Sequence, residues 1–249
     1  MGLRATGSAV LAVASALMMA TGCASQPLTK PMPTGSPQQT TSSRGAASPQ
    51  SASASAQQPA STAGQGLVTC DYPSKGQPAK PVDPPPTNDV AASGTLAVTL
   101  NMTEGPVVIT MDRSATPCAV NSFESLVKQG YFTDTSCHRL VDQGIYILQC
   151  GDPTGTGRGG PGYRMLDELT GQEVYSAGVV AMANSGPDTS GSQFFIVWAD
   201  SQLPPAYTVV GTIDETSLKV VTTIASRGVS AERAPNPISP ARIEQVTLG

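Results

Sequence analysis

The densest glycine segment of the chain, GDPTGTGRGGPGY at residues 151–163, contains a G-x-G-x-x-G pattern between Gly155 and Gly160. In dinucleotide-binding folds this pattern follows a strand and begins a helix, with backbone amides against the pyrophosphate. Here Pro161 and Gly162 come directly after the pattern, and a Pro-Gly pair does not begin a helix. A P-loop is excluded as well, because no Lys-Ser or Lys-Thr pair follows the glycines. The segment therefore indicates a glycine-rich turn that comes close to other groups.

Other side chains that could perform acid–base or nucleophilic chemistry are few. His138 is the only histidine, and the sequence lacks the nucleophile-elbow pattern that accompanies many Ser-His-Asp sites. The carboxylates Asp152, Asp167 and Glu168 flank the glycine segment. For them we expect solvated or turn-capping roles rather than paired-carboxylate catalysis.

The first 22 residues are typical of a secretory signal. Arg4 precedes an apolar stretch at residues 9–20, which is shorter than a typical transmembrane helix. The small residues before Cys23 resemble a bacterial lipobox, in which the chain is cut before the cysteine and its thiol is acylated. We therefore expect an exported protein, lipid-anchored through Cys23 on the outer face of the cytoplasmic membrane or in the cell envelope. The alternative is a cleaved signal peptide followed by an incidental cysteine.

Four further cysteines, an even number in an exported protein, favour two disulfides over free thiols: Cys70, Cys118, Cys137 and Cys150. Four cysteines allow three pairings, and the sequence does not choose among them. A zinc site is the alternative, but none of these spacings is C-x-x-C, so we expect no metal.

Composition divides the chain into a signal at 1–22, a tether at 23–93 and one folded domain at 94–249. The tether is rich in Ser, Ala, Pro and Gln, which bury too little apolar surface to offset the entropy of ordering, so we expect it to be disordered. A short island at 67–72 contains Cys70 and is expected to be attached to the domain by a disulfide. The net charge of −4, without a basic cluster, argues against nucleic acid as a partner.

Within the domain, short runs that alternate polar and apolar residues, or are wholly apolar, predict strands. One helix is predicted to begin at Pro117, a favoured first-turn residue, and to end near Gly130; a second is predicted at 218–225. The strands are predicted at 95–100, 107–111, 137–141, 145–149, 178–182, 194–198, 207–213 and 243–248. Many short strands with two helices indicate a mainly β fold, a closed antiparallel barrel capped at its ends.

Three stretches, in this order and spacing, resemble the cyclophilin-type peptidyl-prolyl cis-trans isomerases: CHR at 137–139, LQCGDPTGTG at 148–157 and MANSGPDTSGSQFF at 182–195. The third is close to the family's MANxGPxTxxSQFF block over its whole length. The resemblance covers about residues 94–249 and implies an eight-stranded closed antiparallel barrel capped by two α-helices. It also implies an enzyme that isomerises X-Pro bonds in proline-containing polypeptides without a cofactor or a metal, and it implies a structural role for His138.

The reaction explains why such residue types suffice. Resonance gives the peptide C–N bond partial double-bond character and a rotation barrier of about 18–20 kcal/mol, yet no covalent bond has to break. The site needs an apolar pocket for the proline ring, a cation that weakens the resonance, and polar groups that hold the flanking backbone. One preorganised donor in a site shielded from water contributes roughly 3–4 kcal/mol.

The resemblance assigns the catalytic roles to three residues. Arg139 matches the essential arginine that donates to the proline nitrogen, Gln149 the glutamine that holds the substrate carbonyl, and Phe195 the floor of the proline pocket. Substrate-binding positions are matched by Tyr146, Ile147, Ala183, Asn184, Gln193, Leu203 and Tyr207. The glycine segment then lines a secondary groove beside the cleft, where small residues leave room for an extended peptide.

Some positions depart from the usual family pattern. The chain is longer than usual between the catalytic arginine and glutamine, so the assignments of Tyr146 and Ile147 depend on where the insertion lies. Tyr207 stands where many eukaryotic members have His, and a tyrosine can still cover the ring and donate a hydrogen bond. Gln202 stands where many members have Trp, so we expect weak cyclosporin binding.

Together these observations predict a monomeric peptidyl-prolyl cis-trans isomerase that assists the folding of exported or envelope proteins. The alternative is a non-catalytic module that binds proline-containing peptides at the envelope. The presence of Arg139 together with Gln149 and Phe195 favours catalysis, because binding alone would not require the arginine.

Overall fold

The computed structural model describes residues 66–249. The predicted signal at 1–22, the predicted lipid anchor Cys23 and the tether up to residue 65 lie outside the described residues. Among residues 66–249, no helix is long and apolar enough to cross a bilayer.

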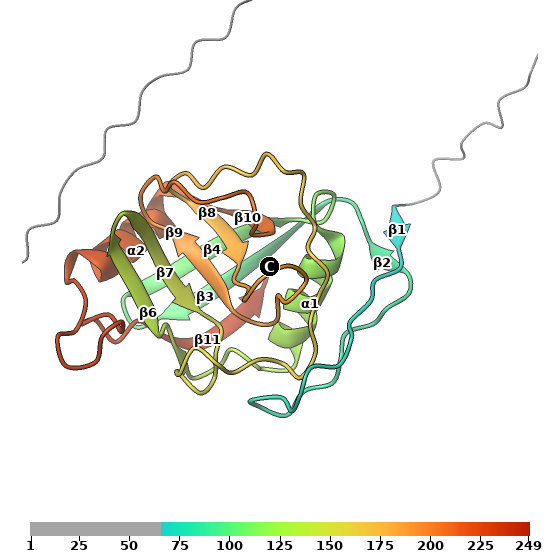
Figure 1. The fold of residues 1–249 in the computed structure, drawn as a ribbon, viewed down its shortest axis with the longest axis horizontal. Coiled ribbons are helices and arrows are strands. Elements are labelled where there is room, and N and C mark those ends of the chain that lie inside the picture. The colour runs from blue at the N-terminus through green and yellow to red at the C-terminus, as the bar shows by residue number, and fades with distance from the viewer. Residues whose placement is uncertain (1–65) are drawn as a thin grey trace, which may run out of the picture. The chain divides into compact units, whose positions relative to one another are not determined.

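The main element of the described chain is one antiparallel sheet of nine strands that curls around a hydrophobic core (Figure 1). In spatial order the strands are β5 (Thr135–Ser136), β11 (Arg242–Leu248), β3 (Thr95–Met102), β4 (Gly105–Asp112), β10 (Val209–Ile213), β8 (Val179–Met182), β9 (Phe194–Val197), β7 (Ile145–Cys150) and β6 (Arg139–Gln143). The predicted mainly β, antiparallel fold is therefore confirmed.

Burial along the strands separates two apolar clusters on the two faces of the sheet. In β3, the alternate residues Leu96, Val98 and Leu100 are buried, which is the period-two pattern of a strand with one face on the core. In contrast, every residue of β8 and β9 is buried. One face of these two strands packs into the main core, and the other packs into a second, smaller cluster. That smaller cluster is the apolar part of the candidate site described below.

Helix α1 (Pro117–Lys128) begins at the predicted proline. The first turn of a helix leaves backbone N–H groups without partners inside the helix. Here the N–H groups of Cys118 and Ala119 donate to the carboxylate of Glu168, at 3.0 and 2.8 Å. Glu168 thus has the capping role expected for a carboxylate beside the glycine segment.

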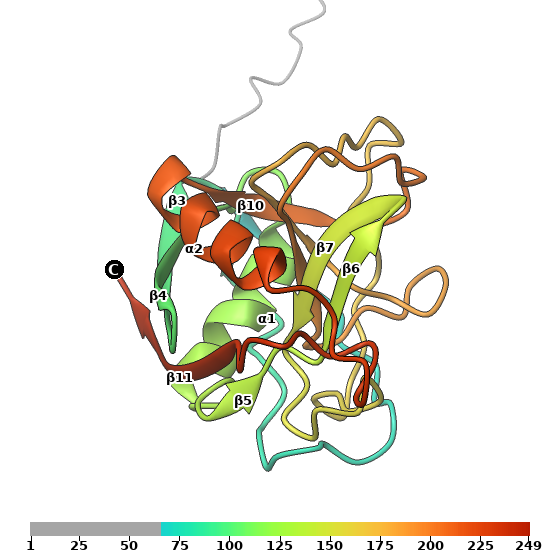
Figure 2. The same cartoon turned by 90° about the vertical axis from the view of Figure 1, so that its left-hand side faces the viewer.

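Helix α2 (Glu215–Ser226) lies on the opposite side of the curled sheet from α1 in Figure 1, and in Figure 2, turned by 90°, it lies in front of α1. It begins earlier than the predicted 218–225, because Asp214 caps it by accepting a hydrogen bond from the N–H of Ser217. Both predicted helices are therefore present.

The predicted closure of an eight-stranded barrel is not seen in the ladder of the described strands. The two end strands of the nine-stranded sheet, β5 and β6, do not pair with each other. They are consecutive in the chain and are joined through Cys137 and His138. The N–H of Cys137 donates to Ala241, beside β11, whereas the N–H of His138 donates to Gln149 on β7. Because the chain changes its partner strand here, the sheet is curled without a closing ladder.

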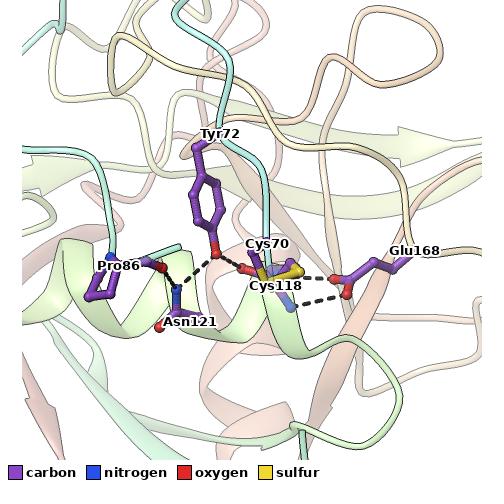
Figure 3. Close-up of a disulfide and its surroundings, with 7 residues drawn as sticks. Cys70, Tyr72, Pro86, Cys118, Asn121 and Glu168 are labelled. Atoms are coloured by element: carbon purple, nitrogen blue, oxygen red, sulfur yellow. Dashed lines mark hydrogen bonds between the residues drawn. A yellow bond between two sulfur atoms is a disulfide. The ribbon is translucent and has the colours of Figure 1, made fainter. Parts of the chain in front are cut away.

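Residues 66–93, which we call the strap, run along α1 and the glycine segment. The ends of the strap pair with each other as β1 (Leu67–Val68) and β2 (Val90–Ala91). A disulfide between Cys70 and Cys118 joins the strap to the first turn of α1 (Figure 3). The strap is the described part of the segment 23–93, and it lies against the domain.

Hydrogen bonds surround this disulfide (Figure 3). The hydroxyl of Tyr72 donates to the carbonyl of Cys118 at 2.9 Å. The amide of Asn121 donates to that hydroxyl and to the carbonyl of Pro86, at 2.8 and 2.9 Å. Burial raises the pKa of Tyr72 to about 12, so its hydroxyl remains a donor at neutral pH. The strap is therefore held by several contacts in addition to the disulfide.

A second disulfide joins Cys137 to Cys150, at the junction between β5, β6 and β7. The four cysteines named from the sequence thus form two disulfides, as predicted, and the structure supplies the pairing. This second disulfide lies next to two of the predicted catalytic residues, because Cys137 precedes Arg139 by two positions and Cys150 follows Gln149 directly.

Candidate active site

The three predicted catalytic residues lie in one row across neighbouring strands. Arg139 on β6 is directly opposite Gln149 on β7, which is directly opposite Phe195 on β9. The row continues to Ala181 on β8. Side chains at directly opposite positions of antiparallel strands share a face and have Cβ atoms about 4.5–5.5 Å apart. The register of the sheet therefore brings a cation, an amide and an aromatic ring side by side.

The apolar end of this row is the second hydrophobic cluster. Phe195 and Ile147 are buried in it, together with Tyr175. The half-buried side chains of Leu203 and Tyr207 pack at its border. The rings of Phe195 and Tyr207 meet edge to face, with centroids 5.4 Å apart. This apolar surface beside Arg139 has the character required of a proline pocket.

The polar end of the row is a chain of side-chain amides, which we call the amide relay. Arg139 Nη1 donates to Gln149 Oε1 at 3.1 Å, and Gln149 Nε2 donates to Gln193 Oε1 at 2.8 Å. Gln193 Nε2 in turn donates to the carbonyls of Gly157 and Gly159, at 3.0 and 2.9 Å. The relay links the guanidinium to the glycine segment and orients both amides. None of the ion pairs among residues 66–249 includes Arg139.

The fully buried side chain of Asp152 holds the glycine segment in place through hydrogen bonds. The carboxylate of Asp152 accepts hydrogen bonds from the N–H and hydroxyl of Thr154 and from the N–H groups of Thr156 and Gly159. Burial alone would raise the pKa of Asp152, but these hydrogen bonds outweigh it and lower the pKa below its ordinary value. Asp152 is therefore an ionised turn-capping residue, and it takes no part in a carboxylate pair.

His138 lies under the same segment and is buried, with 5% of its surface exposed. Neither ring nitrogen has a hydrogen-bond partner among the described residues. Burial lowers the pKa of His138, so the ring is neutral at pH 7. These properties fit the structural role implied by the family resemblance.

Two of the predicted substrate-binding residues border the row from the loop after β8. The backbone N–H of Ala183 donates to the carbonyl of Gln193 at 2.9 Å. The Asn184 amide donates to the carbonyl of Ala206 at 2.7 Å and accepts from the N–H of Gly186 at 3.3 Å. The side chain of Asn184 thus braces its loop, and the backbone beside it lines the groove.

Tyr146 is the predicted site residue that the structure does not bring to this face. Successive side chains of a strand point to opposite faces. Ile147 therefore shares the face of Gln149, whereas Tyr146 points to the other face, where its ring lies 5.0 Å from that of Trp198. In the regular register of β7, Ile145 lies on the same face as Ile147 and packs against the apolar cluster.

The structure adds residues that the sequence did not indicate. Tyr175 lies in the floor of the apolar cluster, and its hydroxyl donates to the carbonyl of Tyr207 at 3.0 Å. It comes from a segment without periodicity, so no pattern identified it. Three strap residues, Lys75, Gly76 and Gln77, line a cavity beside the relay. Among residues 66–249 no cluster of three His, Cys, Asp or Glu side chains could hold a metal ion.

Comparison with known proteins agrees with this geometry. Residues 96–248 match the family described as cyclophilin type peptidyl-prolyl cis-trans isomerase/CLD. The chain is 42% identical over 179 residues to "Probable peptidyl-prolyl cis-trans isomerase B" of Mycobacterium leprae, covering 66% of this chain and 61% of that protein. It is 41% identical over 178 residues to the protein of the same name from Mycobacterium tuberculosis H37Rv, covering 66% and 58%. The chain thus spans less than two thirds of the length of these relatives.

Solved structures show the same fold. A cyclophilin type peptidyl-prolyl cis-trans isomerase from Cryptosporidium parvum superposes with a TM-score of 0.56 at 29% identity, covering 63% of this chain and 98% of that one. A second structure of that protein, in the presence of the dipeptide Ala-Pro, gives a TM-score of 0.55, with coverage of 61% and 98%. The family match covers well over half of the chain and includes the whole Arg139–Gln149–Phe195 row. The chain therefore belongs to the cyclophilin-type peptidyl-prolyl cis-trans isomerase family.

Proposed function

We propose that this chain catalyses cis/trans isomerisation of X-Pro peptide bonds. The observation that carries the proposal is the row of Arg139, Gln149 and Phe195 on three adjacent strands. It supplies a cation free of ion pairs among the described residues, an oriented amide and an apolar surface at directly opposite positions of neighbouring strands. The Ala-Pro dipeptide present with the Cryptosporidium parvum protein supports a proline-containing ligand for this chain as well.

In the proposed mechanism, the proline ring packs on the apolar surface at Phe195 and excludes water from the imide. Gln149 holds the carbonyl that flanks the proline, since its second amide N–H remains available after donation to Gln193. The guanidinium of Arg139 donates to the proline nitrogen as that atom becomes pyramidal, which removes the lone pair from resonance with the carbonyl. The rotation barrier of about 18–20 kcal/mol falls because the C–N bond loses double-bond character.

Replacing the arginine tests the proposal. Arg139→Ala should lower kcat/KM for a proline peptide by about 10²- to 10³-fold, the effect of losing one preorganised donor at a reacting centre. Lys219→Ala is the control, because Lys219 is an exposed cation on α2, outside the row. Binding of the same peptide, followed by NMR titration, should change much less than the rate.

The alternative function, a module that binds proline peptides without turnover, makes the opposite prediction. If the unaltered chain binds the peptide but does not accelerate its isomerisation, or if Arg139→Ala isomerises it at an equal rate, catalysis by this row is refuted.

We also propose that the protein acts outside the cytoplasm, held at the membrane through an acylated Cys23. Support comes from the sequence of residues 1–23 and from the two disulfides, which persist mainly in oxidising compartments. Mass spectrometry of the mature amino terminus should find a chain that begins at a lipid-modified Cys23. A mature chain that begins elsewhere, or an unmodified Cys23, would contradict the anchor.

A further inference from the structure

A cavity of about 500 Å³ adjoins the amide relay. The glycine segment forms one wall through residues 157–163, and residues of the 183–193 loop form another. A third part of the lining comes from the strap residues Lys75, Gly76 and Gln77. These strap residues precede the family match, which begins at residue 96. This wall is therefore a feature of the present chain that the family match does not supply.

Backbone hydrogen bonds fix the strap against the glycine segment. The N–H of Lys75 donates to Gly162 and the N–H of Ala79 to Gly160, both at 2.8 Å. In the other direction, the N–H of Arg164 donates to the carbonyl of Pro73 at 2.9 Å. Together with the Cys70–Cys118 disulfide, these bonds make the strap a fixed wall of the cavity.

The charged side chains in the lining are both cationic. They are Lys75 and Arg158, which are exposed and take part in none of the ion pairs among the described residues. None of the described residues that line the cavity is acidic. The nearest buried carboxylate, that of Asp152, is occupied by hydrogen bonds from its own loop. In a chain with a net charge of −4, this cavity is a local region of positive charge.

The cavity also borders the row of site residues. Gln149 and Gln193 of the amide relay line it, as do Ala183 and Asn184. The family resemblance assigns the last two to the residue that precedes the proline. A peptide with its proline on the apolar surface at Phe195 therefore extends its preceding residues toward the cavity.

From this arrangement we infer that Lys75 and Arg158 make the cavity selective for an acidic side chain located two or three positions before the proline. This inference rests on the proposed isomerase function and names the class of peptide that the site prefers. It also gives the strap a role in substrate choice.

Peptides that differ only in charge test the inference. In the full chain, kcat/KM should be about two- to fivefold higher for a peptide with Glu than for one with Gln, placed two or three positions before the proline, as expected for a solvent-exposed ion pair. Lys at that position should be disfavoured. The preference should weaken between about 0.1 and about 1 M salt, because the screening length falls from about 10 to about 3 Å.

Variants identify the groups responsible. The double variant Lys75→Gln with Arg158→Gln should bring the Glu-to-Gln ratio close to one, and Lys75→Glu should shift the preference toward a Lys peptide. The control is Lys219→Gln, which removes one positive charge, as each single substitution does, at an exposed residue of α2 outside the cavity.

Each outcome decides one question. Equal rates for the Glu and Gln peptides with the unaltered chain overturn the inference and leave the isomerase function standing. A Glu preference that survives in the double variant also overturns it, as does one that Lys219→Gln abolishes. If no peptide is isomerised, the proposed function fails instead, and the dissociation constants of the same peptides then decide the charge preference.

Discussion

Replacing Gly159 by Ala is the sharpest test of how the glycine segment is built. A Cβ atom added at Gly159 would overlap the buried carboxylate of Asp152 and would lie 3.0 Å from the Cβ of Ala79 on the strap. The carboxylate cannot move away freely, because it holds the N–H groups of Thr154 and Thr156 as well as that of Gly159. Either the glycine segment or the Asp152 side chain must therefore shift.

The size of the effect follows from the contacts that are lost. Overpacking a closely packed site costs about 1–3 kcal/mol, and the lost hydrogen bond to a charged group contributes about 1.5–3 kcal/mol. We expect the free energy of unfolding to fall by about 3 kcal/mol or more. Since the carbonyl of Gly159 accepts from Gln193, the amide relay should loosen too, lowering kcat/KM about two- to tenfold, the effect of one weakened neutral hydrogen bond.

The adjacent glycine supplies the matched control for stability. A Cβ atom at Gly160 meets nothing within 4 Å, so Gly160→Ala should be within about 0.5 kcal/mol of the unaltered chain or slightly more stable. Urea unfolding of both variants measures the difference. Equal losses for the two variants, or a loss below about 0.5 kcal/mol for Gly159→Ala, would refute the account of Asp152 as the support of this segment.

Two further predictions concern stability. Replacing both cysteines of the Cys70–Cys118 pair by Ala should cost about 4 kcal/mol, and the same change at Cys137–Cys150 about 3 kcal/mol, because loop-closure entropy grows with the sequence separation, 48 against 13. Equilibrium unfolding without reductant measures both, and the reverse order would contradict this reasoning. The lowered pKa of buried His138 predicts that the free energy of unfolding declines as the pH falls below about 6.5. In that range the His138 ring is protonated in the unfolded chain but stays neutral in the folded chain. The free energy of unfolding, measured at pH 7.5 and 5.5, should show this decline, and the decline should be smaller in His138→Gln. If the free energy of unfolding of the unaltered chain is the same at both pH values, the buried ring is not held neutral.

Much of the fold was predictable from local patterns. The β3–β4 hairpin alternates buried and exposed residues, and α1 begins at Pro117 as its first-turn preference suggests. The start of α2 was missed, because the apolar spacing of that helix is clear only from Leu218 onward, whereas its actual start is set by the Asp214 cap. The partner change at Cys137 and His138 has no sequence signature, since both residues simply continue an extended chain. The strand pattern therefore predicts a closed barrel, whereas the end strands β5 and β6 do not pair with each other.

The catalytic row was found through the motifs, and its geometry follows from register. Applying strand alternation to β7 would have placed Tyr146 and Gln149 on opposite faces, because their separation is odd. The family resemblance instead assigns Tyr146 by its distance from Gln149, and that assignment depends on where the insertion lies. Cys70 predicts that the island at 67–72 is attached to the domain, but composition does not reveal the backbone hydrogen bonds that order the rest of the strap.

The strap and Asp152 together explain why two residues of the glycine segment, Gly159 and Gly162, are glycines. Gly159 lacks room for a Cβ because of the carboxylate beneath it, and Gly162 because Pro78 of the strap lies 3.0 Å from where its Cβ would be. These two glycines thus permit close approach of other protein groups to the segment. With Gly159 packed on Asp152 and Gly162 packed on Pro78 of the strap, the segment places Arg158 in the lining of the cavity, together with Lys75 of the strap. The packing of the segment against Asp152 and the strap therefore places the two cations where a peptide would meet them.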